Sequence, residues 1–112
     1  MAHHLVVIMP PSTKKEATKI VRCLLKERLI ACANIIGPIS SLFWWKDKIE
    51  KAAEFLVLMK SNRKLFDKLT RRVKAIHSYE IPEIFALPIH MGSPSYLNWL
   101  EDNLQLGSKN GG

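Results

Sequence analysis

The sequence has few cysteines and no long apolar run, and both absences narrow the class of protein. Among 112 residues the only cysteines are Cys23 and Cys32, and they form neither a CxxC pair nor a Cys/His spacing typical of zinc sites. No apolar run approaches the ~20 residues of a membrane span, and the first residues lack the pattern of a secretory signal peptide. We therefore expect a cytoplasmic protein of a reducing compartment, without a membrane partner.

Motifs of common enzyme families are also missing. The sequence contains no GxSxG, no glycine-rich phosphate loop, no HExxH, and no serine or cysteine with an evident base partner. A His–Tyr–Glu cluster could support acid–base chemistry, but nothing in the sequence indicates a substrate pocket. We expect no enzymatic activity and no required cofactor.

Negative charge is scarce relative to positive charge. Seventeen Lys and Arg stand against ten Asp and Glu, which gives a formal net charge of +7. Most of these cations fall between the apolar positions of two helical patterns, where they would coat a solvated face. The charge also permits binding to RNA, but the segment FLVLMKS lacks the glycine-rich aromatic pattern on which bases stack. We expect weak, salt-sensitive contact with nucleic acid and no specific nucleic-acid partner.

The hydrophobic pattern predicts one domain over residues 1–106 and a disordered tail at residues 107–112. Thr13 and Ser93 are the expected N-caps, Gly37-Pro38 indicates a bulge or bend, and Asp47 indicates a hairpin turn. The expected strands cover residues 5–9, 31–36 continued by 40–45, 55–59 and 84–89, and the expected helices cover residues 13–28, 62–76 and a segment opening at Ser93.

The order βαββαβ followed by a helix predicts an α+β fold of the ferredoxin-like type. Right-handed crossovers place the four antiparallel strands in the order 4-1-3-2, with both main helices on one face. The end of the first strand, the hairpin and the stretch before the fourth strand then lie at one edge of the sheet. We therefore expect Met9, Thr13, residues 44–48 and residues 77–83 to share a neighbourhood.

Two adjacent tryptophans, Trp44 and Trp45, lie in a predicted strand and should point to opposite sides of it. One can enter the core, and the other needs cover from elsewhere. A partner subunit would provide that cover, so we predict an interface between subunits at these two residues.

The stretch AIHSYEIPEI, residues 75–84, combines a histidine, a tyrosine, two glutamates and a proline. His77 could ligate a metal through a neutral imidazole nitrogen, or it could only terminate a helix. Glu80 and Glu83 could be ligands or could satisfy backbone and lysine groups. The stretch is thus either a rigid corner or a ligand site, and the residues alone leave both interpretations open.

A pair of adjacent histidines, His3 and His4, stands near the start of the sequence. We interpret it as part of a frayed segment without a metal role, although a flexible pair of this kind can chelate copper.

Four separated motifs, KERLIACANI, FWWKDKIE, HSYEIPEI and YLNWL, occur in this order within residues 5–104. Together they resemble the CutA family of divalent-cation tolerance proteins. The resemblance implies a stable ferredoxin-like homotrimer, assembled by pairing of long strands and involved in the response to metal ions. The assembly is similar to that of the PII signalling trimers, so a PII-like trimer that senses a small ligand is the alternative function.

The resemblance also implies a site. Copper-binding members carry a cysteine at the end of the first strand and a histidine pair before the tyrosine, where this sequence has Met9 and Ile76-His77. We expect weak binding of divalent copper by His77, Met9 and Glu83. A pocket for a small ligand is expected at Tyr79, Glu80 and Lys60.

Overall fold

The computed structural model describes residues 3–11, 13–78 and 83–105. Its elements follow the chain in this order: β1 (His4–Met9), α1 (Lys14–Lys26), β2 (Cys32–Trp45), β3 (Lys48–Asn62), the 3-10 turn η1 (Arg63–Leu65), α2 (Phe66–Ile76), β4 (Phe85–Pro88) and α3 (Pro94–Asp102). The strands form one antiparallel sheet in the order β2-β3-β1-β4. The predicted α+β fold and strand order are confirmed.

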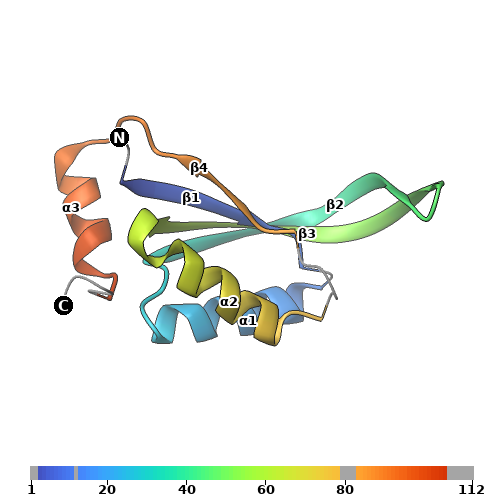
Figure 1. Cartoon of the computed structure of the whole chain (residues 1–112), viewed down its shortest axis with the longest axis horizontal. Coiled ribbons are helices and arrows are strands. Elements are labelled where there is room, and N and C mark those ends of the chain that lie inside the picture. Colours follow the sequence, from blue (N-terminus) through green and yellow to red (C-terminus); the bar gives the residue numbers. More distant parts are fainter. Residues whose placement is uncertain (1–2, 12, 79–82, 106–112) are drawn as a thin grey trace.

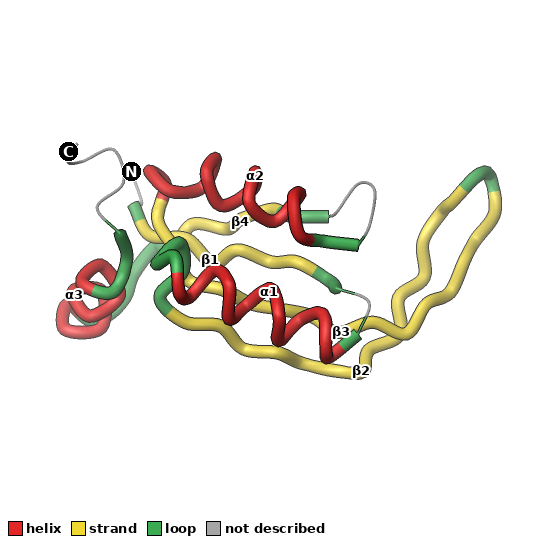
Figure 2. The backbone as a smooth tube through the Cα atoms, turned by 90° about the horizontal axis from the view of Figure 1, so that it is seen from below, coloured by secondary structure: helices red, strands yellow, loops and turns green. Residues whose placement is uncertain are grey.

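Helices α1 and α2 lie side by side on one face of the sheet (Figures 1 and 2). Each carries apolar residues three and four positions apart, so one side of each helix meets the sheet. Alternate residues of β1 and β3 meet them from the sheet. The buried residues contributed by these four elements include Ala17, Ile20, Val21, Leu24, Leu69, Val73, Leu5, Val7, Met9, Val57 and Met59.

Capping explains where the helices begin. Thr13 accepts a hydrogen bond from the backbone N–H of Glu16 at 3.0 Å, and Ser93 accepts one from the N–H of Tyr96 at 3.3 Å. Pro94 occupies the first turn of α3, where its missing N–H has no helical partner to lose. Both predicted N-caps are confirmed.

The opposite face of the sheet is largely apolar as well, although it also carries Asn34 and Lys60. The register places Val6, Ile8, Leu58 and Leu87 on it, and Phe85 and Leu87 are exposed. An antiparallel sheet that faced water here would be expected to carry polar residues. This surface therefore has the composition of a contact surface.

Strand β2 covers nearly the residues predicted, whereas β3 begins at Lys48, well before the predicted segment 55–59. The ends of the two strands form a two-stranded arm that projects beyond the helices (Figure 1). The arm ends in a two-residue turn between Trp45 and Lys48, in which Lys46 and Asp47 both have positive φ. This is the backbone of a type I′ hairpin. The turn predicted at Asp47 is confirmed.

The bend predicted at Gly37-Pro38 is also present. Pairing runs from Ile36↔Leu56 to Ile39↔Glu54, so two residues of β2 stand opposite the single residue Phe55 of β3. The N–H of Phe55 donates instead to the carbonyl of Pro11 at 3.1 Å. The sheet thus passes into the arm at this bulge.

Replacing Gly37 by alanine tests the packing at the bulge. The added Cβ would lie 2.5 Å from Cδ2 of Phe55 and 2.9 Å from its Cγ. We expect the free energy of unfolding to fall by about 1–3 kcal/mol, the usual cost of overpacking, as measured by urea denaturation. In a Phe55→Ala background the ring is gone, so the same substitution should cost clearly less. An equal cost in both backgrounds would contradict this account.

Candidate functional site

The corner at His77 joins two helices. His77 ends α2, and its backbone N–H donates to the carbonyl of Val73 at 2.8 Å. The N–H of the next residue, Ser78, donates to the Glu16 carboxylate at 2.7 Å. Because Glu16 lies in the first turn of α1, the N-terminal turn of α1 and the C-terminal end of α2 are joined here.

The charges of two acidic residues, Glu16 and Glu54, influence the pKa of His77. His77 is only 8% exposed. Burial lowers the pKa of His77 below its ordinary value, and the negative charges of Glu16 and Glu54 oppose this by raising it. The effect of burial prevails, so His77 favours the neutral imidazole, the form that can ligate a metal. Glu54 in β3 is itself buried.

Glu16 and Glu54 were not predicted as members of this corner. In the sequence Glu16 was assigned only to the capping pattern, and Glu54 directly precedes an apolar run. The position of Glu54 was a weak indication of such a role, because a charged residue next to a buried strand needs a partner when it is itself buried.

The predicted metal ligands and pocket residues lie in different surroundings. Met9 is fully buried in the hydrophobic core, whereas Glu83 is exposed. Lys60 pairs with Val6 and Cys32, towards the other end of the sheet from Glu54. Tyr79 and Glu80 lie outside the described residues. The structure therefore brings His77 together with Glu16 and Glu54, and it places Lys60 elsewhere.

The hairpin does not share the neighbourhood of Met9 and His77, and that prediction is wrong. The turn at Lys48 is six residues along β3 from Glu54, which at the usual rise of a strand is about 20 Å. The error arose because topology alone placed the hairpin at the same edge of the sheet as Met9, whereas β3 continues from Val57, the partner of Met9, as far as Lys48.

Both predicted interface tryptophans are exposed within this chain, Trp44 at 72% and Trp45 at 54%. The prediction that one of them enters the core is wrong, because the arm lies beyond the helices that could cover it. Leu42, Phe43 and Ile49 on the same arm are exposed as well. The arm therefore presents apolar side chains on both of its faces.

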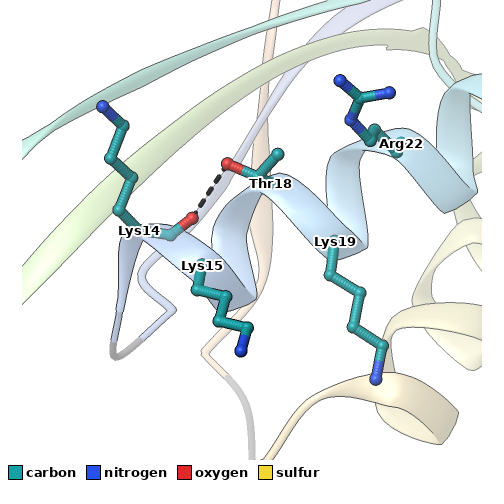
Figure 3. A pocket seen from close by; sticks show the side chains of 5 residues that line it. All are labelled: Lys14, Lys15, Thr18, Lys19 and Arg22. Atoms are coloured by element: carbon teal, nitrogen blue, oxygen red, sulfur yellow. Dashed lines mark hydrogen bonds between the residues drawn. The ribbon is translucent and has the colours of Figure 1, made fainter.

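The positive charge of α1 lies on its outer side, as expected. Lys14, Lys15, Thr18, Lys19 and Arg22 line a shallow surface depression, and Thr18 Oγ1 donates to the carbonyl of Lys14 at 2.9 Å (Figure 3). All five residues come from successive turns of one helix, so they form a solvated helical surface and not an enclosed site.

A span across a membrane is not found among the described helices, since none of them is long and apolar enough.

Element order, sheet order and the long β2–β3 arm define a small α+β protein of the ferredoxin-like type. The chain belongs to the CutA1 divalent ion tolerance protein family, whose model matches residues 5–103. The resemblance identified from four sequence motifs is confirmed.

Two solved structures show how closely the fold agrees. The divalent cation tolerance protein (Cut A1) from Thermus thermophilus gives a TM-score of 0.89 at 39% identity, covering 91% of this chain and 99% of that one. CutA1 from Oryza sativa gives a TM-score of 0.90 at 36% identity, covering 93% of this chain and 95% of that one.

Relatives differ in total length and in described location. The divalent-cation tolerance protein CutA of Thermus thermophilus is 41% identical over 98 residues, which are 88% of this chain and 95% of the relative. The chloroplastic protein CutA 1 of Oryza sativa is 38% identical over 99 residues, 88% of this chain, and the match covers only 56% of that relative. A solved Archaeoglobus fulgidus relative, 38% identical, is described as periplasmic. The cytoplasmic location of this protein stays a prediction.

The pH dependence of stability should reveal the buried His77. Because its pKa is lowered in the folded protein, the unfolded chain binds a proton at a pH where the folded chain still excludes it. Stability should therefore decrease as the pH falls below about 6.5, the ordinary pKa of histidine, and this loss should stop below the folded-state pKa. Urea denaturation at several pH values should show this slope in the parent and a smaller slope in His77→Gln.

Glu54→Gln provides the matched comparison. It removes one of the two charges that raise the pKa of His77, so the NMR titration of His77 should move to lower pH. The loss of stability on acidification should then continue to a lower pH than in the parent. Equal slopes in the parent and His77→Gln would contradict the assignment.

Proposed function

We propose that this protein is a non-catalytic homotrimer that takes part in the response to divalent metal ions and binds copper weakly at the His77 corner. The exposed apolar side chains of the β2–β3 arm are the observation that carries the proposal. Membership of the divalent ion tolerance family supports the role in the metal response.

The arm supports assembly for two reasons. Its exposed large apolar residues, Leu42, Phe43, Trp44, Trp45 and Ile49, are adjacent in space, and a stable monomer rarely leaves such a patch in water. β2 is also an edge strand of the sheet, with backbone groups available to a strand of another chain. An arm that meets a different surface of the next subunit makes a head-to-tail contact, which forms a closed ring when the rotation between subunits closes.

The receiving surface is proposed to be the apolar sheet face that carries Phe85 and Leu87. It lies on the side of the sheet away from α1 and α2, and β4 is the other edge strand. Arm and face are thus separate surfaces of one chain. The number of three subunits is the one implied by the family resemblance.

Copper binding at the His77 corner is supported by charge. The carboxylates of Glu16 and Glu54 act on His77, and their negative charge would also favour a cation bound to the imidazole nitrogen. The binding is expected to be weak, because His77 is mostly buried and Met9 lies fully inside the core. Of the common divalent first-row metals, copper should bind most tightly here.

Light scattering should give three chains per particle at micromolar concentration. If unfolding is reversible, the melting temperature should rise with protein concentration, because dilution favours dissociated chains. Trp44→Ser combined with Trp45→Ser should shift the particles towards monomers. Trp99→Ser is the matched control, since Trp99 is also an exposed tryptophan but lies on α3, where it stacks on Tyr96. A monomeric parent protein would refute the proposed assembly.

Copper binding should be measured by calorimetry in a background carrying His3→Ala and His4→Ala, so that the histidine pair cannot compete. We expect weak binding that is tighter for copper than for zinc and that is lost on adding His77→Ala. Copper retained after that change would show that the corner is structural, and the metal part of the proposal would fail while the assembly part remained.

A further inference from the structure

His3 and His4 do not belong to a frayed segment, which corrects the interpretation of this pair from the sequence. His4 is the first residue of β1 and pairs with Asn62 of β3. The carbonyl of His3 accepts from the N–H of Arg63 at 2.9 Å, and the carbonyl of His4 accepts from the N–H of Ile89 at 2.9 Å. The backbone that carries both imidazoles is therefore anchored to two other segments.

Both imidazoles approach one carboxylate on α3. His4 Nε2 lies 2.9 Å from Glu101 Oε1, and His3 Nε2 lies 3.3 Å from the same oxygen. The two rings are 4.8 Å apart between centroids and nearly perpendicular. Asn62 Nδ2 donates to both carboxylate oxygens of Glu101 at 3.4 Å. Two histidines and one glutamate thus converge, with an amide that orients the carboxylate.

The two separations between a histidine nitrogen and Glu101 Oε1 match those between ligands of a bound transition metal. Two ligand atoms that each lie about 2.0–2.1 Å from zinc are about 3.3 Å apart at a tetrahedral angle and about 2.9 Å apart at a right angle. The ligand atoms of His3, His4 and Glu101 all lie within 4.8 Å of one another, and within the described residues they form the only such group of three. Small side-chain rotations would allow all three atoms to reach one ion.

The charge of the carboxylate suits a cation. Burial raises the pKa of Glu101, but hydrogen bonds from Asn62 and His4 and the nearby histidines lower it more, so its pKa lies below the ordinary value. The carboxylate is therefore ionised at neutral pH. The side chains of His3 and Glu101 are 38% and 41% exposed, which leaves a route for an ion and for water.

Contacts outside the cluster also hold α3 in place. Leu100 and Leu104 are buried in the core. Beyond the helix, Gln105 donates from its backbone N–H to the carbonyl of Arg28 at 2.8 Å and from Nε2 to that of Glu27 at 2.7 Å. One histidine would suffice for a hydrogen bond to Glu101, yet the second approaches the same oxygen while its ring packs edge-to-face on the first. A shared metal ion gives both histidines a function.

We propose that His3, His4 and Glu101 form a surface site for a divalent transition metal, bound by two imidazole nitrogens and one carboxylate, with water completing the coordination. Zinc is the reference ion, because two histidines and a glutamate are a ligand set that it accepts in tetrahedral geometry. The site lies at the opposite end of β1 from Met9 and the His77 corner, and it does not depend on the proposed function. A bound ion would tie the start of β1 to α3.

Calorimetric titration with zinc chloride tests the proposal in the full chain. The parent should bind one zinc ion per chain at this site. His3→Ala and Glu101→Gln should each weaken binding at least about tenfold, the loss that even an outer-shell partner of a metal causes. Glu101→Gln keeps a side-chain oxygen that can accept from Asn62 and His4, so it separates metal binding from packing. Circular dichroism without metal checks that each variant is folded.

Two further variants locate the ion. His90→Ala removes an exposed histidine outside the cluster and should bind zinc like the parent, as should His77→Ala. Cobalt substituted for zinc should give the visible absorption of a tetrahedral site in the parent and lose it in His3→Ala. No zinc binding by the parent, unchanged binding in His3→Ala and Glu101→Gln, or loss in His77→Ala would each overturn the inference. The last result would instead support a metal at the His77 corner.

Discussion

Strand β3 pairs with two neighbours over different lengths, and the rest of the structure depends on this difference. β1 pairs only with residues 57–62 of β3, whereas β2 pairs with β3 as far as the hairpin turn. The inner half of β3 therefore lies in a four-stranded sheet beneath two helices, and its odd-numbered residues are buried. The outer half has one neighbour and lies beyond the helices. The inner half of β3 thus contributes to the core, and its outer half contributes to the arm proposed for assembly.

The candidate corner lies where these halves meet. Phe55 stands opposite the bulge in β2 and donates its N–H to Pro11, just after β1. Glu54 is the next residue towards the arm, and its charge acts on His77. The corner is thus held by the end of β1, the first turn of α1, the end of α2 and the bulge. A change of charge at this corner therefore takes place next to the base of the arm.

Local signals in the sequence were sufficient for the order of the elements. The caps at Thr13 and Ser93, the turn at Asp47 and the interruption at Gly37-Pro38 each depend on a few neighbouring residues, and the structure contains all of them. The strand as far as Trp45 and the turn at Asp47 were predicted, but the outer half of β3 was not, because residues 48–54 are mostly polar and are held by backbone pairing. Because the arm extends beyond the helices, both Trp44 and Trp45 are exposed.

The candidate sites were only partly predictable, since they depend on contacts between distant segments. His77 was identified by its own chemistry, but Glu16 and Glu54 reach it only through the packing of α1, α2 and β3. His3 and His4 were judged by their position near the start of the sequence. Their backbone partners, Arg63 and Ile89, and their carboxylate partner, Glu101, are far away in the chain, so no local pattern could reveal that they are anchored.

The arm also has a consequence for the order of events during synthesis. A hairpin closed by a two-residue turn needs only local contacts and can form within microseconds, whereas β4 and α3 are made later. The residues of the aromatic arm are therefore made before β4, an edge of the sheet face proposed to receive the arm. During that interval it is a hazard for association between unfinished chains. The charged residues Lys46, Asp47, Lys48, Glu50 and Lys51 stand at its tip and along β3. Charges beside an apolar strand generally disfavour such association.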